Sequence, residues 1–393
     1  MPCEASFAMN TELFIEILGI DSTTGREGEL AAFLARELPT QKCRLERFPV
    51  ETMTSVCPAG CPLPENLLFS WGEPKVVFCT HMDTVPPYIY PTLDESEVRG
   101  RGTCDAKGQI LAMYEACLEL ERRGYDGFGL LLLAGEETGS FGAKAFSACG
   151  RFDEAQSDNW VIVGEPTDNH MASAAKGTKS FEVTFEGRAC HSGYPEQGLS
   201  AVEMFNDFMN ALRSIGFPYD DILGETTWNV GKLSSDNPQN ILSDRLSCRV
   251  YFRTTFESDE MVCNVMRNMA GPQAKLRFGR RKVQDGSDIV AKDVAAWQKA
   301  MNVKAYGGDT PMRYDVLEGF WTKPVAFGSD APQLNCFRHR ILCGPGSILV
   351  AHRPEEHVRL ADLETAKANY INMYEQIACT TLNSVNDRIM MKK

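Results

Sequence analysis

The sequence predicts a two-domain α/β protein in which a smaller α+β domain is inserted into a larger domain with a mixed sheet. Helical and short apolar segments alternate up to about residue 176, and this alternation returns after about residue 285. Between these points, polar and apolar residues alternate as in half-exposed strands. A chain of 393 residues can bury two separate cores. We therefore expect residues 1–176 and 285–393 to form one discontinuous domain, and residues 177–284 to form the insert.

The first part of the chain alternates amphipathic helices with buried strands. Helical spacing of apolar residues predicts helices at residues 11–18, 27–38 and 107–123, the last closed by Gly124. Short apolar runs predict buried strands at residues 75–80, 130–134 and 160–163. This alternation favours a mostly parallel or mixed sheet covered by helices.

The insert and the end of the chain have their own patterns. In the insert, we expect strands at residues 179–187, 226–233 and 245–256, and helices at residues 198–213 and 258–270. The last convincing amphipathic segment, residues 361–378, predicts a helix that completes the core of the larger domain.

Composition excludes several classes of function. The net charge of −13, without a dense run of Lys and Arg, argues against nucleic acid as a partner. The apolar run at residues 128–135 is too short to cross a membrane, and the N-terminus lacks a signal-peptide pattern, so we expect a cytoplasmic protein. Fourteen dispersed cysteines indicate reduced thiols. Cys57 and Cys61 lack a second pair at zinc-site spacing, so they are not expected to bind a metal.

Acids and histidines follow the predicted strands or lie in neighbouring loops. They are His81, Asp105, Glu136, Glu137, Glu165 and His352. Ligands collect beyond the carboxyl ends of strands in open α/β sheets, so these loops are expected to converge. Each residue alone is equally compatible with a polar strand end or a solvated loop charge.

Together, these residues fit a pair of divalent metal ions. Three carboxylates from Asp105, Glu137 and Glu165 would repel one another unless cations lay between them. Imidazole ligands from His81 and His352 favour zinc, which cobalt or manganese can replace.

Spacing separates the roles of neighbouring residues. In an extended segment, residues two apart face the same side, so Asp83 can accept a hydrogen bond from the second ring nitrogen of His81. Adjacent residues face opposite sides, so Glu136 and Glu137 are not expected to do the same task. One can bind a metal while the other acts as a general base.

The ordered motifs HMDTVP, GRGTCDAKG, GEETGS, VGEPT, GRACHSG and GPGSILVAHRPEEH resemble those of a known enzyme family. It is the dinuclear zinc aminoacylase and carboxypeptidase-G-like metallopeptidase family, which includes acetylornithine deacetylase and succinyl-diaminopimelate desuccinylase. The resemblance covers nearly the whole chain. It implies that His81, Asp105 and Glu165 hold one metal and that Asp105, Glu137 and His352 hold the other. It also implies Glu136 as the general base and Asp83 as the acid that orients His81.

The resemblance further implies a dimerisation or lid role for the insert. There, His191 corresponds to a histidine that reaches across a homodimer to stabilise the oxyanion, although alone it would be taken for a surface residue. Asn240, Arg253, Gly328 and Ser329 match substrate-binding positions, and the Arg253 fork suits a substrate carboxylate. His170, His339 and His357 are not expected to be ligands. The DAKGQ segment and the short stretch between Asp83 and Asp105 depart from the family pattern.

The expected function is hydrolysis of an N-acyl amino acid, with acetylornithine deacetylase, an enzyme of arginine biosynthesis, as the nearest member. A desuccinylase, another aminoacylase or a dipeptidase stays open, because ligands fix the reaction and leave the substrate pockets undetermined. The alternative of a different class is a binding protein that kept the fold and lost catalysis. That alternative predicts a missing ligand or base, and the sequence retains all of them.

Overall fold

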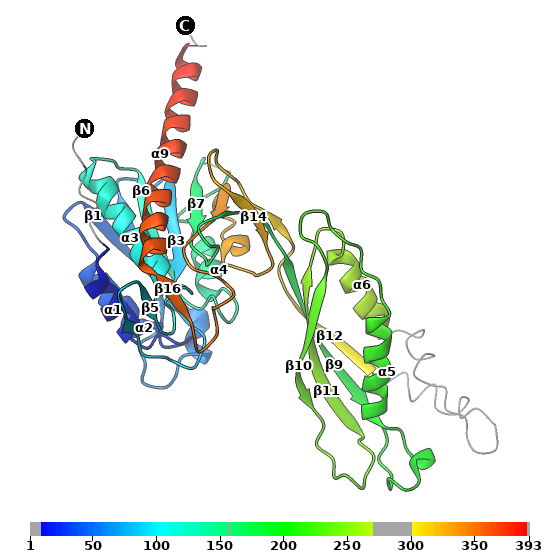
Figure 1. Cartoon of the computed structure of the whole chain (residues 1–393). Helices are drawn as coiled ribbons and strands as arrows, with labels where there is room; N and C mark the ends of the chain where they lie inside the picture. The colour runs from blue at the N-terminus through cyan, green and yellow to red at the C-terminus, as the bar shows by residue number, and fades with distance from the viewer. Residues whose placement is uncertain (1–8, 156–157, 270–300, 391–393) are drawn as a thin grey trace. The chain divides into compact units, whose positions relative to one another are not determined.

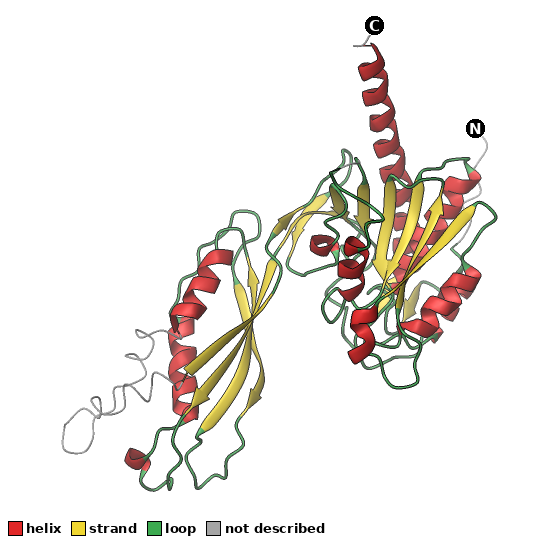
Figure 2. Cartoon of the chain, turned by 180° about the vertical axis from the view of Figure 1, so that it is seen from behind, coloured by secondary structure: helices red, strands yellow, loops and turns green. Residues whose placement is uncertain are grey.

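The chain forms two compact units in a computed structural model that describes residues 9–155, 158–269 and 301–390. The first unit comprises Met1–Ser173, Tyr314–Lys323 and Ser329–Lys393, and the second comprises Ala174–Arg313 and Pro324–Gly328. Figures 1 and 2 show the elements of each unit from opposite sides. The expected combination of a mixed α/β sheet and a separate α+β unit is confirmed.

The first unit is built on a six-stranded sheet of order β1-β2-β6-β3-β7-β15. These strands are β1 (Cys43–Pro49), β2 (Glu65–Trp71), β3 (Val76–His81), β6 (Phe128–Leu133), β7 (Trp160–Val163) and β15 (His339–Leu342). β1 and β2 run antiparallel to their neighbours, whereas β6, β3, β7 and β15 run parallel. The four parallel strands therefore end at the same edge of the sheet.

Helices of the first unit pack on this sheet or extend from it. They are α1 (Thr11–Gly19), α2 (Glu27–Glu37), α3 (Lys107–Arg122), α4 (Phe141–Ala148) and α9 (Leu360–Met390), with 3-10 helices η1 (Glu51–Ser55) and η3 (Ala331–Gln333). The Asn10 side chain caps α1 by accepting a hydrogen bond from the Leu13 amide at 3.0 Å. A small sheet of order β16-β5-β4 joins His357–Arg359, Glu97–Arg99 and Thr92–Leu93.

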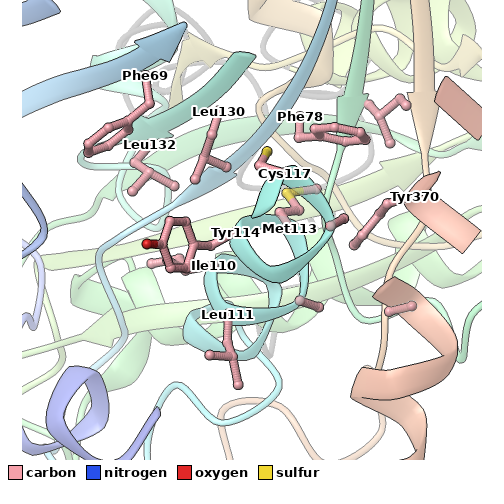
Figure 3. Close-up of a cluster of buried hydrophobic side chains, with 14 of the residues drawn as sticks. Phe69, Phe78, Ile110, Leu111, Met113, Tyr114, Cys117, Leu130, Leu132 and Tyr370 are labelled. Atoms are coloured by element: carbon pink, nitrogen blue, oxygen red, sulfur yellow. The ribbon is translucent and has the colours of Figure 1, made fainter. Parts of the chain in front are cut away.

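The core of the first unit lies between α3 and the sheet, with α9 beside them (Figure 3). The labelled side chains are Phe69, Phe78, Ile110, Leu111, Met113, Tyr114, Cys117, Leu130, Leu132 and Tyr370. Leu130 is fully buried there, and truncating such a side chain to Ala costs about 2–5 kcal/mol. The core therefore fixes the strands whose ends carry the polar residues.

Gly164 allows the end of β7 to approach α3 closely. A Cβ atom at this position would lie 2.7 Å from Met113 Cε and 3.1 Å from Gln109 Cβ. The absence of a side chain thus permits the packing that places the next residue, Glu165, at the sheet edge.

The second unit is an antiparallel sheet of order β10-β11-β9-β12 covered on one face by two helices. Its elements are β9 (Gly177–Glu186), η2 (Pro195–Gln197), α5 (Ala201–Arg213), β10 (Thr227–Ser234), β11 (Arg245–Thr254), α6 (Asp259–Met269), β12 (Met301–Gly307) and β13 (Met312–Arg313). Alternate residues of β11 are buried against the helices, as the polar alternation in the sequence predicts. Ser200 caps α5 by accepting a hydrogen bond from the Glu203 amide at 3.2 Å.

The unit boundaries differ from the expected ones at two segments, residues 301–313 and 324–328, which belong to the second unit. The first boundary, after Ser173, lies within β8 (Met171–Ala175) and close to residue 176. The expected second boundary, between residues 284 and 285, lies outside the described residues. Residues 301–313 belong to the second unit, because β12 adds a fourth strand to the sheet by pairing with β9. The chain returns to the first unit after Arg313 and enters the second unit again within β14 (Thr322–Val325). It returns finally to the first unit after Gly328.

Candidate active site

The candidate active site lies at the edge of the sheet where the four parallel strands end. His81 is the last residue of β3, Glu136 and Glu137 follow β6, and Glu165 follows β7. His352 lies in the loop after β15, and Asp105 lies in the turn before α3. For His81, Glu136, Glu137 and Glu165 the local cause is the same, because each follows or ends a buried apolar run of the sheet.

Three buried residues form a first group of possible metal ligands: His81, Asp105 and Glu165. Each offers one ligand atom, and these atoms lie within 4.8 Å of one another. The His81 Nε2 atom lies 3.1 Å from Asp105 Oδ1 and 4.0 Å from Glu165 Oε1. The main chain of Asp105 continues into α3 through a cis peptide bond with Ala106.

A second group consists of Asp105, Glu137 and His352. The His352 Nε2 atom lies 3.1 Å from both Asp105 Oδ2 and Glu137 Oε1. The two oxygens of Asp105 thus face different histidines, so Asp105 belongs to both groups. The structure brings together all five residues of the predicted ligand set, with the shared position that the resemblance implies.

The electrostatics of the two groups suit cations. Burial raises the pKa of Glu165 well above its usual range, and burial also raises the pKa of Glu137. Hydrogen bonds with Asp105 and Glu137 raise the pKa of His352 to about 10. Burial lowers the pKa of His81, but hydrogen bonds with Asp105 and Asp83 outweigh this effect and raise it overall. Buried carboxylates this close together are unfavourable without a cation, and two divalent ions would offset their negative charge.

The donor set fits a pair of divalent metal ions. Each group combines one imidazole with two carboxylates, a mixture that zinc and similar transition metals accept. Sharing Asp105 requires the two ions to be neighbours, as in two-metal hydrolytic sites.

Glu136 lies beside this ligand set but in neither group. Burial raises its pKa well above the usual range, and the nearby Glu165, Asp330 and Glu137 carboxylates add to the rise. A carboxylate that is close to the ligands and belongs to neither group is available for proton transfer.

Asp83 is fully buried, and its carboxylate has partners in addition to His81. The nearest partner of His81 Nδ1 is the main-chain carbonyl of Asp83, at 2.9 Å, whereas the carboxylate is 3.5 Å away. Asp83 Oδ1 accepts the Glu136 amide at 3.0 Å, and Oδ2 accepts the Glu137 amide at 3.1 Å. The Thr24 hydroxyl donates a further bond to Oδ2 at 2.9 Å. The side chain therefore holds the 136–137 loop, and both the carbonyl and the carboxylate of Asp83 face His81 Nδ1.

Asp330 is a buried carboxylate that the sequence analysis passed over. It is 2% exposed, and neither oxygen accepts a hydrogen bond of normal geometry from a described residue. Burial raises its pKa to about 7, although the charge of His81 opposes the rise. The available signal was its position directly after Ser329, in a loop already expected to contact substrate.

Four of the predicted residues lie in the second unit. His191 is exposed, and its Nδ1 accepts the Gly193 amide at 3.0 Å. The Asn240 carbonyl accepts the Ser192 amide at 2.9 Å, so the segments carrying His191 and Asn240 are adjacent. The Arg253 guanidinium lies over the Tyr251 ring, 5.1 Å from its centre, and Nη1 is 3.7 Å from where a Cβ on Gly328 would lie.

Ser329 belongs to the first unit and is 3% exposed. Its hydroxyl lies 3.4 Å from the Tyr314 hydroxyl. Ser329 Oγ also accepts the Ala331 amide at 3.3 Å, which orders the start of η3.

The remaining histidines and the cysteine pair lie outside the ligand groups found among the described residues. His339 contacts Asp315 and Asp158 at 3.1 Å each and stacks on Trp160. His170 and His357 contact main-chain carbonyls close in sequence. Cys57 and Cys61 are free thiols, as are the other described cysteines.

Two ligand groups that share a buried aspartate, with a separate glutamate beside them, define a metal-dependent hydrolase. The model of peptidase family M20/M25/M40 matches residues 77–376. The chain therefore belongs to this peptidase family, which confirms the resemblance found in the sequence.

Two relatives support the same conclusion. A protein of Aspergillus fumigatus named probable carboxypeptidase is 30% identical over 391 residues, covering 90% of this chain and 83% of the relative. A peptidase M20 domain-containing protein of Schizosaccharomyces pombe is 29% identical, covering 91% of this chain and 82% of the relative.

Solved structures with lower identity share the fold. A tripeptidase of Staphylococcus aureus superposes with a TM-score of 0.70 at 19% identity, covering 93% of this chain and 98% of that chain. A Bacillus subtilis protein described as a dinuclear metal-binding M20 peptidase gives 0.61 at 10% identity, covering 92% and 96% of the two chains. The chain is thus a metallopeptidase-like enzyme that hydrolyses amide bonds. Among its described residues, none of the helices combines the length and apolarity needed to span a membrane.

Proposed function

We propose that this enzyme hydrolyses an amide bond whose nitrogen belongs to an amino acid with a free α-carboxylate. A carboxypeptidase and an N-acyl amino acid deacylase both cleave this bond and differ in the group on its carbonyl side. The first activity is supported by the names of the fungal relatives and the second by the sequence motifs. The proposal therefore requires only the feature that the two substrates share.

The carbonyl side of the substrate separates the candidates within this class. The motifs favour a small acyl group, with N-acetylornithine as the first candidate and succinyl-diaminopimelate as the second. The relatives favour a short peptide. A binding protein without activity is the weakest candidate, because every predicted ligand and the candidate base are present.

Two divalent ions are the proposed cofactors, with zinc as the expected metal. His81, Asp105 and Glu165 would hold one, and Asp105, Glu137 and His352 the other. When bound, such ions polarise the scissile carbonyl and lower the pKa of water.

Glu136 is the proposed general base. It takes a proton from the attacking water and delivers it to the nitrogen of the leaving amino acid. Its raised pKa makes the carboxylate a stronger base toward the attacking water, and the protonated acid can still donate to the more basic nitrogen of the leaving amino acid. The amides of Glu136 and Glu137 are both held by Asp83, which fixes the base relative to the ligand beside it.

Three residues of the second unit and Ser329 of the first are the proposed substrate contacts. The Arg253 guanidinium can form a bidentate pair with the α-carboxylate, with Asn240 and the loop of Gly328 and Ser329 as further contacts. His191 is proposed to stabilise the oxyanion from the partner chain of a homodimer. The reducing cytoplasm stays the expected location, in keeping with the dispersed cysteines.

One observation carries the proposal: Glu136 stands beside the ligand set without belonging to either group. Its test is Glu136→Gln, which removes the base and retains the shape of the side chain. Turnover should fall by about 10²–10⁴-fold while both metal ions stay bound. Glu95→Gln, the same change at an exposed position, is the control. Activity of Glu136→Gln within threefold of the wild type would reassign the base.

A substrate panel tests the proposed bond. N-acetyl, N-succinyl and N-formyl amino acids and short peptides are each compared with their C-terminal carboxamides. For every active substrate, we expect kcat/KM to be much lower for the carboxamide than for the free acid. In Arg253→Gln, the ratio of kcat/KM between acid and carboxamide should be smaller than in the wild type. Equal hydrolysis of acids and carboxamides would contradict the proposal.

A further inference from the structure

Glu356 is a fully buried carboxylate outside both ligand groups, yet it contacts the turn that carries Asp105. Its Oε1 atom accepts three main-chain amides of that turn. The distances are 2.9 Å from Gly102, 3.2 Å from Cys104 and 3.3 Å from Asp105. One oxygen thus accepts hydrogen bonds from three main-chain amides, and one of these amides belongs to Asp105, which both ligand groups share.

The second oxygen of Glu356 is paired with a buried cation. Its Oε2 atom lies 2.5 Å from Arg101 Nη1, and Arg101 is only 2% exposed. The same guanidinium donates to the carbonyls of Pro87 at 3.3 Å and Arg353 at 3.4 Å. The ion pair therefore connects the turn before Asp105 with the loop that carries His352.

The backbone of Glu356 fixes the same connection. Its carbonyl accepts the Gly100 amide at 3.0 Å, and β16 pairs with β5 directly beyond it, His357 opposite Arg99. His352 lies four residues before Glu356 in the same loop. Glu356 consequently ties together, through both side chain and main chain, the two segments that place Asp105 and His352.

We infer that Glu356 is a positioning residue that sets Asp105 relative to His352 and thereby sets the affinity for the ion of the second group. This inference rests on the proposed ligand set. Asp105, Glu137 and His352 come from three segments far apart in the chain, and only a fixed separation lets all three reach one ion. Outer partners of metal ligands commonly act in this way.

A carboxylate is required here because of what surrounds it. An amide in its place would keep one acceptor for the three main-chain amides but would turn N–H groups toward Arg101, which itself can only donate. Glutamine therefore breaks the connection to Arg101, with little change in volume. Glu355 next to it is exposed, so the same substitution there provides a matched control.

The test measures metal binding by metal-free wild type, Glu356→Gln and Glu355→Gln, each titrated with Zn²⁺ against a chromophoric chelator. Folding of each metal-free protein is followed by circular dichroism, and the Co²⁺ absorption spectrum reports the coordination of each ion. We expect Glu356→Gln to weaken binding of one ion about 10–100-fold and to alter its Co²⁺ spectrum. Glu355→Gln should match the wild type within twofold.

The outcomes separate this inference from the proposed function. Two zinc ions bound by the wild type support the proposed ligand set, and the ratio of affinities between variant and wild type then tests Glu356. A folded Glu356→Gln that binds both ions as the wild type does would overturn the inference alone. A wild type that binds no second ion would remove the ligand set, and the inference with it.

A second variant covers a failure of Glu356→Gln to fold. Glu356→Asp keeps the negative charge for Arg101 and shortens the side chain by one methylene, which withdraws the acceptor from the three amides. We expect the same selective loss of one ion. If neither variant folds even with saturating Zn²⁺, Glu356 serves the fold as a whole and the inference is wrong.

Discussion

Replacing Asp83 by Asn tests whether one buried side chain organises the catalytic loop. The wild-type carboxylate accepts the consecutive amides of Glu136 and Glu137, at 3.0 and 3.1 Å, with a different oxygen for each. Asparagine has a single acceptor oxygen, so one of these amides would face the NH₂ group of the new side chain. Glu136 or Glu137 must then move.

The magnitude follows from the two bonds. A hydrogen bond to a charged group contributes about 1.5–3 kcal/mol, and a buried amide left without an acceptor costs about 1–3 kcal/mol. We therefore expect Asp83→Asn to lower the free energy of unfolding by roughly 2–4 kcal/mol. Displacement of Glu136, the proposed base, by even a fraction of an ångström should reduce kcat by about 10²-fold, with a smaller change in KM.

The assay combines urea unfolding, metal content and steady-state kinetics. Asp94→Asn is the control, because Asp94 Oδ1 also accepts two consecutive amides, of Ser96 and Glu97, at 2.9 Å each, but on the surface. We expect that variant to keep wild-type kinetics. If Asp83→Asn retains kcat within threefold and full stability, the loop is held by other contacts and our account of Asp83 is wrong.

Three further predictions concern pH, metal and assembly. Burial and the Asp83 charge raise the pKa of Glu27 to about 8, from an ordinary 4.5, so the folded chain binds this proton more tightly than the unfolded chain and its stability falls as pH rises between these values. The free energy of unfolding of Glu27→Gln should then exceed that of the wild type by roughly 2–4 kcal/mol at pH 8. Urea unfolding curves should show that this difference vanishes below pH 4.5. Chelation of the metal should lower the midpoint temperature of thermal unfolding. Zinc at 100 times its Kd should add back about 2.7 kcal/mol to the free energy of unfolding for one site. A midpoint that chelation leaves unchanged would count against a bound metal. His191→Ala should lower kcat of a dimer without changing its sedimentation, whereas a fully active wild-type monomer would exclude a role across the subunit boundary.

The parts of the fold that depend on local pattern were predictable. Apolar runs gave β3, β6 and β7, and helical spacing gave α3, because a buried strand or an amphipathic helix needs those residues wherever it lies. The convergence of the ligand residues followed from one rule, that parallel strands of a sheet end at a common edge. The hydrolase class follows from that convergence.

The parts that depend on distant contacts were not predictable. The Asp83 carboxylate accepts two amides more than fifty residues away, whereas spacing alone pointed only to His81. Glu356 contacts a turn about 250 residues earlier, and no local pattern marks it. Residues 301–313 resembled the first pattern in the sequence, and only the pairing of β12 with β9 assigns them to the second unit.

The interruption of the first unit by the second has a consequence for synthesis on the ribosome. His81, Asp105, Glu137 and Glu165 emerge early, but β15 and His352 emerge only after the whole insert. The second unit has a core of its own and can fold while the first still lacks its edge strand. A nascent chain therefore has all three residues of the first group long before His352 emerges, and the second group of proposed metal ligands is complete only when translation is almost finished.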